Sequence, residues 1–143
     1  MKLPSSKLVY SSTPIYSGSN FTWGEATKNC TRHIQDLIID GILIKSAIQI
    51  EATIVDTARK LDELRYSLGK RPIHVNSWYR PTHINSRVGG SKFSRHQFGD
   101  AVDIRSDYLS AKKIFNQLAD HVGGLSAYYS FVHIDWRGKK ARW

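Results

Sequence analysis

The sequence is poor in cysteine, and Cys30 is the only one in the chain. No disulfide can therefore form within the molecule, which excludes the small folds that disulfides hold together. A chain of 143 residues is long enough to bury a core without disulfides or a structural metal ion. A metal site in this chain would therefore be free to serve chemistry.

Long apolar runs are also missing from the sequence. No stretch approaches the ~18 continuous apolar residues of a membrane-spanning helix, so we expect no stable membrane insertion. The first ~25 residues lack the charged start, apolar middle and small-residue cleavage site of a secretory signal. These absences predict synthesis in the cytoplasm, and a substrate outside that compartment would need a partner that delivers the protein to it.

Acidic residues are scarce relative to basic ones, with 12 Asp and Glu against 21 Lys and Arg and a formal charge of +9. This charge favours a polyanionic partner such as nucleic acid, an anionic membrane or a bacterial cell wall. A nucleic-acid partner has no supporting motif, because the sequence holds neither long Lys/Arg runs nor zinc-finger spacing. We therefore expect no nucleic-acid partner. Separately, we expect the protein to be a monomer.

The order of sequence patterns predicts one domain over residues 1–143. Residues 1–20 are rich in Ser, Thr, Tyr and Pro without a helical period, which indicates an extended arm. Phe21 and Trp23 then precede a stretch with weak helical character that ends near Gly41. These two aromatic residues are best interpreted as packing anchors.

The clearest helix begins after Ser46, where apolar residues recur mostly at spacings of three or four. Ser46 and Gln49 match a capping box, and Gly69 stands where a C-terminal cap belongs. The apolar stripe consists of Ile48, Ile54, Val55, Ala58, Leu61, Leu64 and Leu68.

Beyond Pro72 the pattern changes to short strands, predicted at 73–78, 101–104 and 131–136. A helix capped by Ser110 is predicted through His121 and is stopped by the glycine pair that follows.

Two of these strands carry polar residues that a plain buried strand would not have. Strand alternation sends His133 and Asp135 to one face of the sheet. In the other strand, Val102 and Ile104 belong to the core and Asp103 to the opposite face. His96 lies in a loop seven residues before Asp103, with a glycine between them that allows a tight bend.

Two neutral imidazoles and one carboxylate make a typical catalytic zinc set, because three protein ligands leave the fourth position open to water. The bound water then has a pKa near ~7 and can supply hydroxide. By spacing alone, however, the evidence for a metal site is weak, because a strand histidine with an aspartate two residues later is often just a hydrogen-bonded surface pair.

The segment SRHQFGDAVDI resembles the signature of the zinc D-alanyl-D-alanine carboxypeptidases and their endopeptidase relatives. The pattern Ser-x-His-x-x-Gly-x-Ala-x-Asp is filled by Ser94, His96, Gly99, Ala101 and Asp103. The later FVHID, followed by WRG, resembles the strand of this family that supplies a third ligand. Upstream, NSWYRP resembles a Ser-x-Tyr-Arg segment of the same family, and the three blocks occur in the family's order.

The resemblance covers residues 70–143 and implies zinc bound by His96, Asp103 and His133. It implies an α+β fold with a small antiparallel sheet and flanking helices that line a zinc cleft, related in fold to the hedgehog signalling domain. The implied substrates are the stem peptides of bacterial peptidoglycan. Arg80, on the family's arginine, is then expected to pair with a substrate carboxylate or the oxyanion, or to form a structural salt bridge.

The general base is the point at which the sequence departs from these relatives, because Ser130 stands where several of them have a carboxylate. Asp135 is the expected catalytic replacement, either as the base or as the group that orients His133. Ser94 and Gln97 are expected to bind substrate by shaping the cleft through hydrogen bonds.

The resemblance leaves several functions open. The first is a phage-type endolysin or cell-wall peptidase that acts after release by a lysis partner or as a virion-associated protein. The second is a cytoplasmic D-dipeptidase or D,D-carboxypeptidase. A third, from another class, is an inactive wall-binding module that keeps the zinc fold, and only the missing acid at Ser130 supports it.

Overall fold

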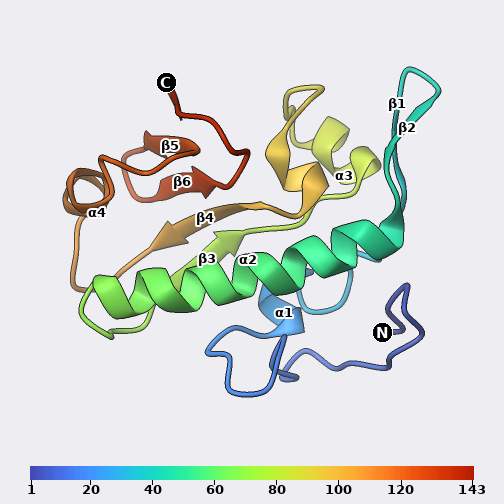
Figure 1. The fold of residues 1–143 in the computed structure, drawn as a ribbon, viewed down its shortest axis with the longest axis horizontal. Coiled ribbons are helices and arrows are strands. Elements are labelled where there is room, and N and C mark those ends of the chain that lie inside the picture. The colour runs from blue at the N-terminus through green and yellow to red at the C-terminus, as the bar shows by residue number, and fades with distance from the viewer.

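The computed structural model describes residues 1–143 as a five-stranded sheet with one long helix and several short ones around it (Figure 1). The strand order is β3–β4–β6–β5–β7, and neighbouring strands are antiparallel except for β5 and β7. The predicted α+β class with a small antiparallel sheet is confirmed. The strands are β3 (His74–Ser77), β4 (Ala101–Arg105), β5 (Gly124–Ala127), β6 (Val132–Asp135) and β7 (Ala141–Arg142).

The long helix α2 (Ala47–Ser67) confirms the predicted helix and its cap. The hydroxyl of Ser46 accepts the Gln49 N–H, while the Gln49 side chain accepts the Ser46 N–H, so two free amides at the helix start are satisfied. Gly69 follows the helix with a φ of 103°, a left-handed conformation that suits glycine. The buried face of α2 consists of Ile50, Ile54, Thr57, Ala58, Leu61 and Leu64.

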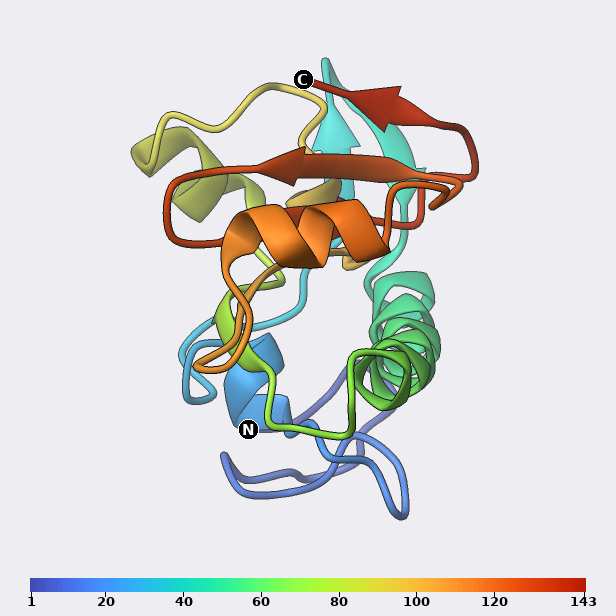
Figure 2. The same cartoon turned by 90° about the vertical axis from the view of Figure 1, so that its left-hand side faces the viewer.

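One face of the sheet belongs to the same apolar core as α2. Val102 and Ile104 of β4, and Val132 and Ile134 of β6, have no exposed surface. Figure 2 shows α2 nearly end-on, with α2 and the short α1 (Trp23–Ala26) below β5 and β6. Because side chains alternate along a strand, the residues between these core positions must project from the other face.

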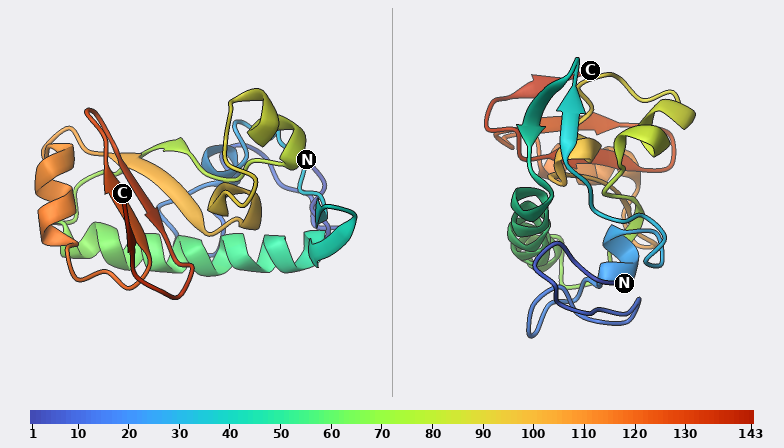
Figure 3. Two further views of the ribbon diagram at one scale, coloured as in Figure 1. Left: turned by 90° about the horizontal axis from the view of Figure 1, so that it is seen from above. Right: turned by 90° about the vertical axis from the view of Figure 1, so that its right-hand side faces the viewer.

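The prediction of a weakly helical stretch between α1 and Gly41 is wrong. The chain instead forms a hairpin of β1 (Leu37–Ile39) and β2 (Ile42–Lys45), which stands out from the body at one end of α2 (Figure 3). Asp40 and Gly41 make its turn with φ values of 52° and 77°. An Asp-Gly pair favours such a two-residue turn, and turn chemistry outweighed weak helical periodicity here.

The helix predicted through His121 is shorter than expected, since α4 (Ala111–Gln117) ends four residues earlier. Its N-cap is Ser110, as predicted. Beyond the helix, Nε2 of His121 donates to the carbonyl oxygen of Asp135 at 2.7 Å, so this histidine is held against the sheet rather than in a helix. The sheet also includes β5 and β7, which the sequence did not indicate, and two further short helices are α3 (Thr82–Arg87) and the 3₁₀ turn η1 (Arg95–Phe98).

The N-terminal arm is fastened to α2 through Asp62. Its carboxylate accepts hydrogen bonds from the hydroxyls of Tyr16 and Ser19 and from the backbone and side-chain N–H groups of Asn20. Leu3, Val9 and Ile15 of the arm are buried in the main core. No helix combines the length and the apolar character that crossing a bilayer would require.

Candidate metal centre

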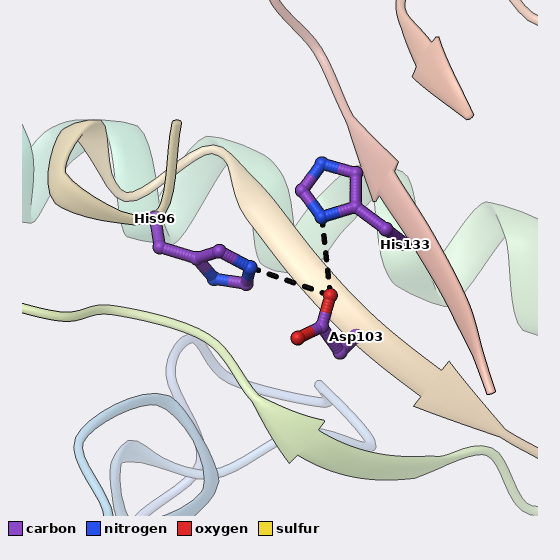
Figure 4. Close-up of side chains that lie close together, drawn as sticks. All are labelled: His96, Asp103 and His133. Atoms are coloured by element: carbon purple, nitrogen blue, oxygen red, sulfur yellow. Dashed lines mark hydrogen bonds and ion pairs between the residues drawn. The ribbon is translucent and has the colours of Figure 1, made fainter. Parts of the chain in front are cut away.

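Asp103 and His133 lie directly opposite each other on the paired strands β4 and β6. Their side chains project from the face that does not pack on α2, which passes behind the strands in Figure 4. This arrangement follows from the alternation predicted in each strand, since the flanking Val102 and Ile134 are buried. The antiparallel register therefore brings together two residues that are far apart in sequence.

His96 comes from η1, just before β4. The Ser94 hydroxyl accepts the His96 N–H at 3.3 Å and so begins this turn, which Gly99 ends with a φ of 86°. A Cβ at Gly99 would lie 3.0 Å from Cγ1 of Ile54, so glycine also lets the turn rest on α2. The tight bend predicted from Gly99 is the local cause of the convergence.

The three side chains present donor atoms to one point. Nε2 of His96 lies 3.3 Å from Oδ1 of Asp103, and Nδ1 of His133 lies 3.1 Å from the same oxygen. All three potential ligand atoms lie within 4.8 Å of one another. Atoms bound at 2.0–2.1 Å to one tetrahedral ion are about 3.3 Å apart, so this donor set fits zinc.

Both histidines use their second ring nitrogen to hold the ring in place. Nδ1 of His96 donates to the carbonyl oxygen of Trp78 at 2.6 Å, and Nε2 of His133 donates to Oδ2 of Asp135 at 2.8 Å. Each bond leaves the lone pair of the other nitrogen directed toward Asp103. Such partners of ligand histidines fix the tautomer and the ring orientation.

Asp135 has no exposed surface, and its carboxylate is fully engaged. Besides His133, it accepts hydrogen bonds from the Gly124 N–H at 2.9 Å and from Nε and Nη2 of Arg137 at 2.8 and 2.6 Å. A Cβ at Gly124 would stand 2.1 Å from Oδ2 of Asp135, so glycine is required there. Sequence reasoning treated Gly124 only as a helix stop.

The charges of the centre stabilise one another. Burial acts to raise the pKa of Asp103, but the adjacent rings of His133 and His96 outweigh it and hold that pKa well below its ordinary value. Burial similarly opposes ionisation of Asp135, whose pKa is nevertheless held far down by Arg137, His133 and the Gly124 amide. For His133, burial acts to lower the pKa, but the negative charges of the adjacent Asp103 and Asp135 outweigh it and raise that pKa. Both carboxylates are therefore ionised at neutral pH.

The remaining predicted site residues lie on the segments around η1. The half-buried Arg80 donates through Nη1 to Oδ1 of Asn85 at 3.2 Å. Burial lowers the pKa of Arg80, and the nearby charge of Asp103 partly offsets this. Ser94 caps η1, as described above. The buried Gln97 donates through Nε2 to the carbonyl oxygen of Lys92 at 2.9 Å. The expectation that Ser94 and Gln97 bind substrate stays a prediction.

Sequence reasoning missed an aromatic neighbour of the centre. The ring of Trp143 meets that of His133 edge-on, with the centroids 5.0 Å apart. Nε1 of Trp143 donates to the hydroxyl oxygen of Tyr128 at 2.9 Å, and Arg137 lies over the Trp143 ring. Arg137 could have been anticipated, since it continues the alternation of His133 and Asp135, whereas nothing near Trp143 in the sequence indicated its contact.

A buried, preorganised set of two imidazoles and one carboxylate, carried on an α+β sheet, defines the class of protein as one with a zinc site of the kind that zinc metallopeptidases use. Within this class the chain belongs to the family described as Peptidase M15, whose model matches residues 18–135. The matched region includes the three zinc-site residues. This finding confirms the resemblance on which the zinc expectation rested.

The chain is also similar to the zinc D-Ala-D-Ala carboxypeptidase of Streptomyces albus G. The two are 41% identical over 59 residues, which is 41% of this chain and 23% of that protein. The matched part is therefore less than a quarter of the relative's own length. Zinc is the cofactor that both comparisons and the donor set support.

Proposed function

We propose that this protein hydrolyses peptide bonds in the stem peptides or cross-links of bacterial peptidoglycan. The observation that supports the proposal most is the convergence of His96, Asp103 and His133 as zinc ligands, with both rings already held by second hydrogen bonds. The name of the Streptomyces relative supports a D-alanyl peptide as substrate. The net charge of +9 supports action at an anionic wall.

In the proposed reaction, His96, Asp103 and His133 would hold a zinc ion, which when bound would acidify a water molecule and polarise the peptide carbonyl. Arg80 binds an anionic group of the substrate beside the metal, where Asp103 lies close to it. Of the two roles left open for Asp135, its geometry supports orientation of His133, because every side of its carboxylate already accepts a hydrogen bond. A base needs a free lone pair to take a proton from water.

We also propose that the protein acts as a lysis enzyme that a membrane-permeabilising partner releases to the wall. The strong positive charge supports this setting, since it would concentrate the protein on wall polymers of opposite charge. A wall-binding module without catalysis is the second candidate. It is favoured by one observation, the combination of Ser130 at the family's acid position with a fully engaged Asp135.

The deciding experiment is digestion of purified peptidoglycan, followed by mass analysis of the released muropeptides. The zinc-loaded protein should shorten stem peptides or open cross-links, and a chelator should abolish this. The variant His133→Ala should be inactive, while the matched control His33→Ala, at an exposed histidine that is not one of the candidate zinc ligands, should keep its activity. Intact stem peptides after incubation with zinc-loaded protein would refute the peptidase and favour the binding module.

A further inference from the structure

Arg32 lies beside the segment that joins β3 to the zinc centre. It follows the turn after α1, is half-buried, and donates through Nη1 to the carbonyl oxygen of Tyr79 at 3.1 Å. The next residue, Arg80, donates its backbone N–H to the carbonyl oxygen of His96 at 3.1 Å. Two guanidinium groups thus flank one short segment that is bonded directly to a zinc-site residue.

Neither guanidinium forms a direct ion pair with a carboxylate, although Asp103 lies near enough to Arg80 to act on its charge. Other arginines near the centre are paired: Arg95 bonds Asp100, and Arg137 bonds Asp135. By contrast, Arg32 is bonded through its guanidinium to a carbonyl oxygen, and Arg80 to the amide oxygen of Asn85. Burial lowers the pKa of Arg32, and the charge of Arg80 lowers it further, so an anion between the two would relieve an unfavourable concentration of positive charge.

The space next to Arg32 can take a ligand group. A hollow of about 190 Å³ lies along the outer side of β3, and its lining includes Lys28, Arg32 and Ser77. Glu25 also lines it, but its carboxylate already accepts the Thr22 N–H at the start of α1. β3 is an edge strand that pairs only with β4, where Ser77 lies opposite Asp103. Neighbouring strands are about 4.8 Å apart, so the hollow begins one strand away from the zinc-site carboxylate. A peptide bound at the metal could extend over β3 into it.

We propose that Arg32 is a substrate-binding residue, which together with Arg80 recognises a carboxylate group of the peptide. The proposal rests on the peptidase function and deepens it by naming the substrate class, namely peptides with a free carboxylate close to the bond that is cut. A planar guanidinium matches a carboxylate through two parallel hydrogen bonds, and two guanidiniums can hold both of its oxygens. The carboxylate comes either from the C-terminus of the peptide or from an acidic side chain within it.

The test is calorimetric binding to the zinc-loaded protein. The ligand is a tripeptide that ends in two D-alanines, with its last CO–NH replaced by CO–CH₂ so that no cleavage occurs, and it is compared with its C-terminal amide. Loss of a charged hydrogen-bonding group predicts that Arg32→Met weakens binding of the acid about tenfold to hundredfold and leaves binding of the amide unchanged. Arg32→Lys should recover part of the loss, because it keeps the charge.

A second ligand pair places either glutamate or glutamine inside a peptide with an amidated end. If Arg32→Met weakens binding of the acid but not the amide in the first pair, the recognised carboxylate is the C-terminus of the peptide. If it weakens binding of the glutamate peptide but not the glutamine peptide in the second pair, the recognised carboxylate is a side chain. Equal weakening of acid and amide, or no weakening in either pair, would overturn the proposal. The control is Arg59→Met, at an arginine stacked on Tyr16 of the N-terminal arm, and thermal melting establishes that each variant is folded.

Hydrolysis of the natural peptide is measured separately with the same variants. Binding that depends on Arg32, without any hydrolysis by the unaltered protein, would refute the peptidase and leave the carboxylate site standing. Hydrolysis of the natural peptide, combined with binding that is indifferent to Arg32 in both ligand pairs, would do the reverse. The two proposals therefore fail independently.

Discussion

Replacement of Asp135 by asparagine tests how the zinc centre is held together. In the unaltered protein the carboxylate accepts the Nε2–H of His133, which keeps the Nδ1 lone pair free and directed toward Asp103. Asparagine has one oxygen and one NH₂ group. If its oxygen stays with Arg137 and the Gly124 amide, its NH₂ group faces Nε2 of His133. Two donors then meet, and the ring relieves the conflict by moving its proton to Nδ1, where it blocks the metal.

We expect zinc affinity to fall tenfold to hundredfold, which corresponds to about 1.4–2.7 kcal/mol of binding free energy. This is the usual effect of removing the hydrogen-bond partner of a ligand histidine. The substitution should also lower the free energy of unfolding, because it removes the charge that pairs with Arg137. Removing one partner of a buried ion pair costs about 3–5 kcal/mol. Arg137 is itself 25% exposed, so the lower end of that range is expected.

The assay is competition for zinc between the protein and a chromophoric chelator, combined with peptidoglycan digestion at saturating zinc. If Asp135 orients His133, zinc affinity falls and most activity returns when zinc is added in excess. If Asp135 is the base, zinc affinity stays near normal and activity is lost at every zinc concentration. Unchanged affinity together with unchanged activity would refute both roles and the reasoning from tautomers.

Two further predictions concern positions outside the ligand set. Gly124→Ala should weaken zinc binding about as much as loss of Asp135 does, because the new Cβ would stand 2.1 Å from that carboxylate; chelator competition measures the effect, and normal affinity would show that the strands shift to make room. Asp62→Asn should lower the free energy of unfolding at pH 7 by about 1–2 kcal/mol, as measured by urea denaturation, because several hydrogen bonds to the N-terminal arm lose their charged acceptor. Burial acts to raise the pKa of Asp62, but the hydrogen bonds from Tyr16 and the adjacent arm residues outweigh it and hold that pKa below its ordinary value. The stabilisation that the ionised Asp62 gives the fold is therefore present above pH ~4 and is lost as the pH falls further. A difference between Asp62→Asn and the unaltered protein that persists at pH 2 would contradict this assignment.

The parts of the fold that were predictable are those in which a local pattern matches a local structure. The apolar period of three to four residues, with Ser46 and Gln49 at its start, identified α2 to within a residue. Alternation identified β4 and β6 and the faces of Asp103 and His133, because the side-chain period of a strand is fixed at two. The convergence of the ligands then followed once the family resemblance indicated that the two strands belong together.

The hairpin of β1 and β2 was not predicted, although its turn carried a usable signal. Asp40 and Gly41 separate two apolar runs, a pattern that favours a hairpin, but the run before them also fitted a weak helix. Over a short apolar segment, hydrophobic periodicity does not distinguish a helix from a strand. The hairpin keeps Ile38, Ile42 and Leu43 exposed, so burial gave no guide either.

The contacts around the zinc centre were the least predictable features. Arg32 reaches the segment before Arg80 across a wide gap in sequence, and it does so because the irregular chain after α1 returns to β3. Trp143 packs on His133 for a similar reason, through β7. No local pattern encodes such contacts, because they depend on how whole elements are placed.

The pairing of β4 with β6 has a consequence for how this scaffold tolerates change. Asp103 and His133 are set opposite each other by strand register, so their separation does not depend on the number of residues that connect the strands. The connection, residues 106–131, contributes α4 and β5 but no zinc-site residue. Insertions at its exposed turn around Tyr129 should therefore leave the donor geometry intact, whereas a one-residue slip of either strand would turn its ligand toward the core. New recognition loops can thus be grafted there without redesigning the metal site.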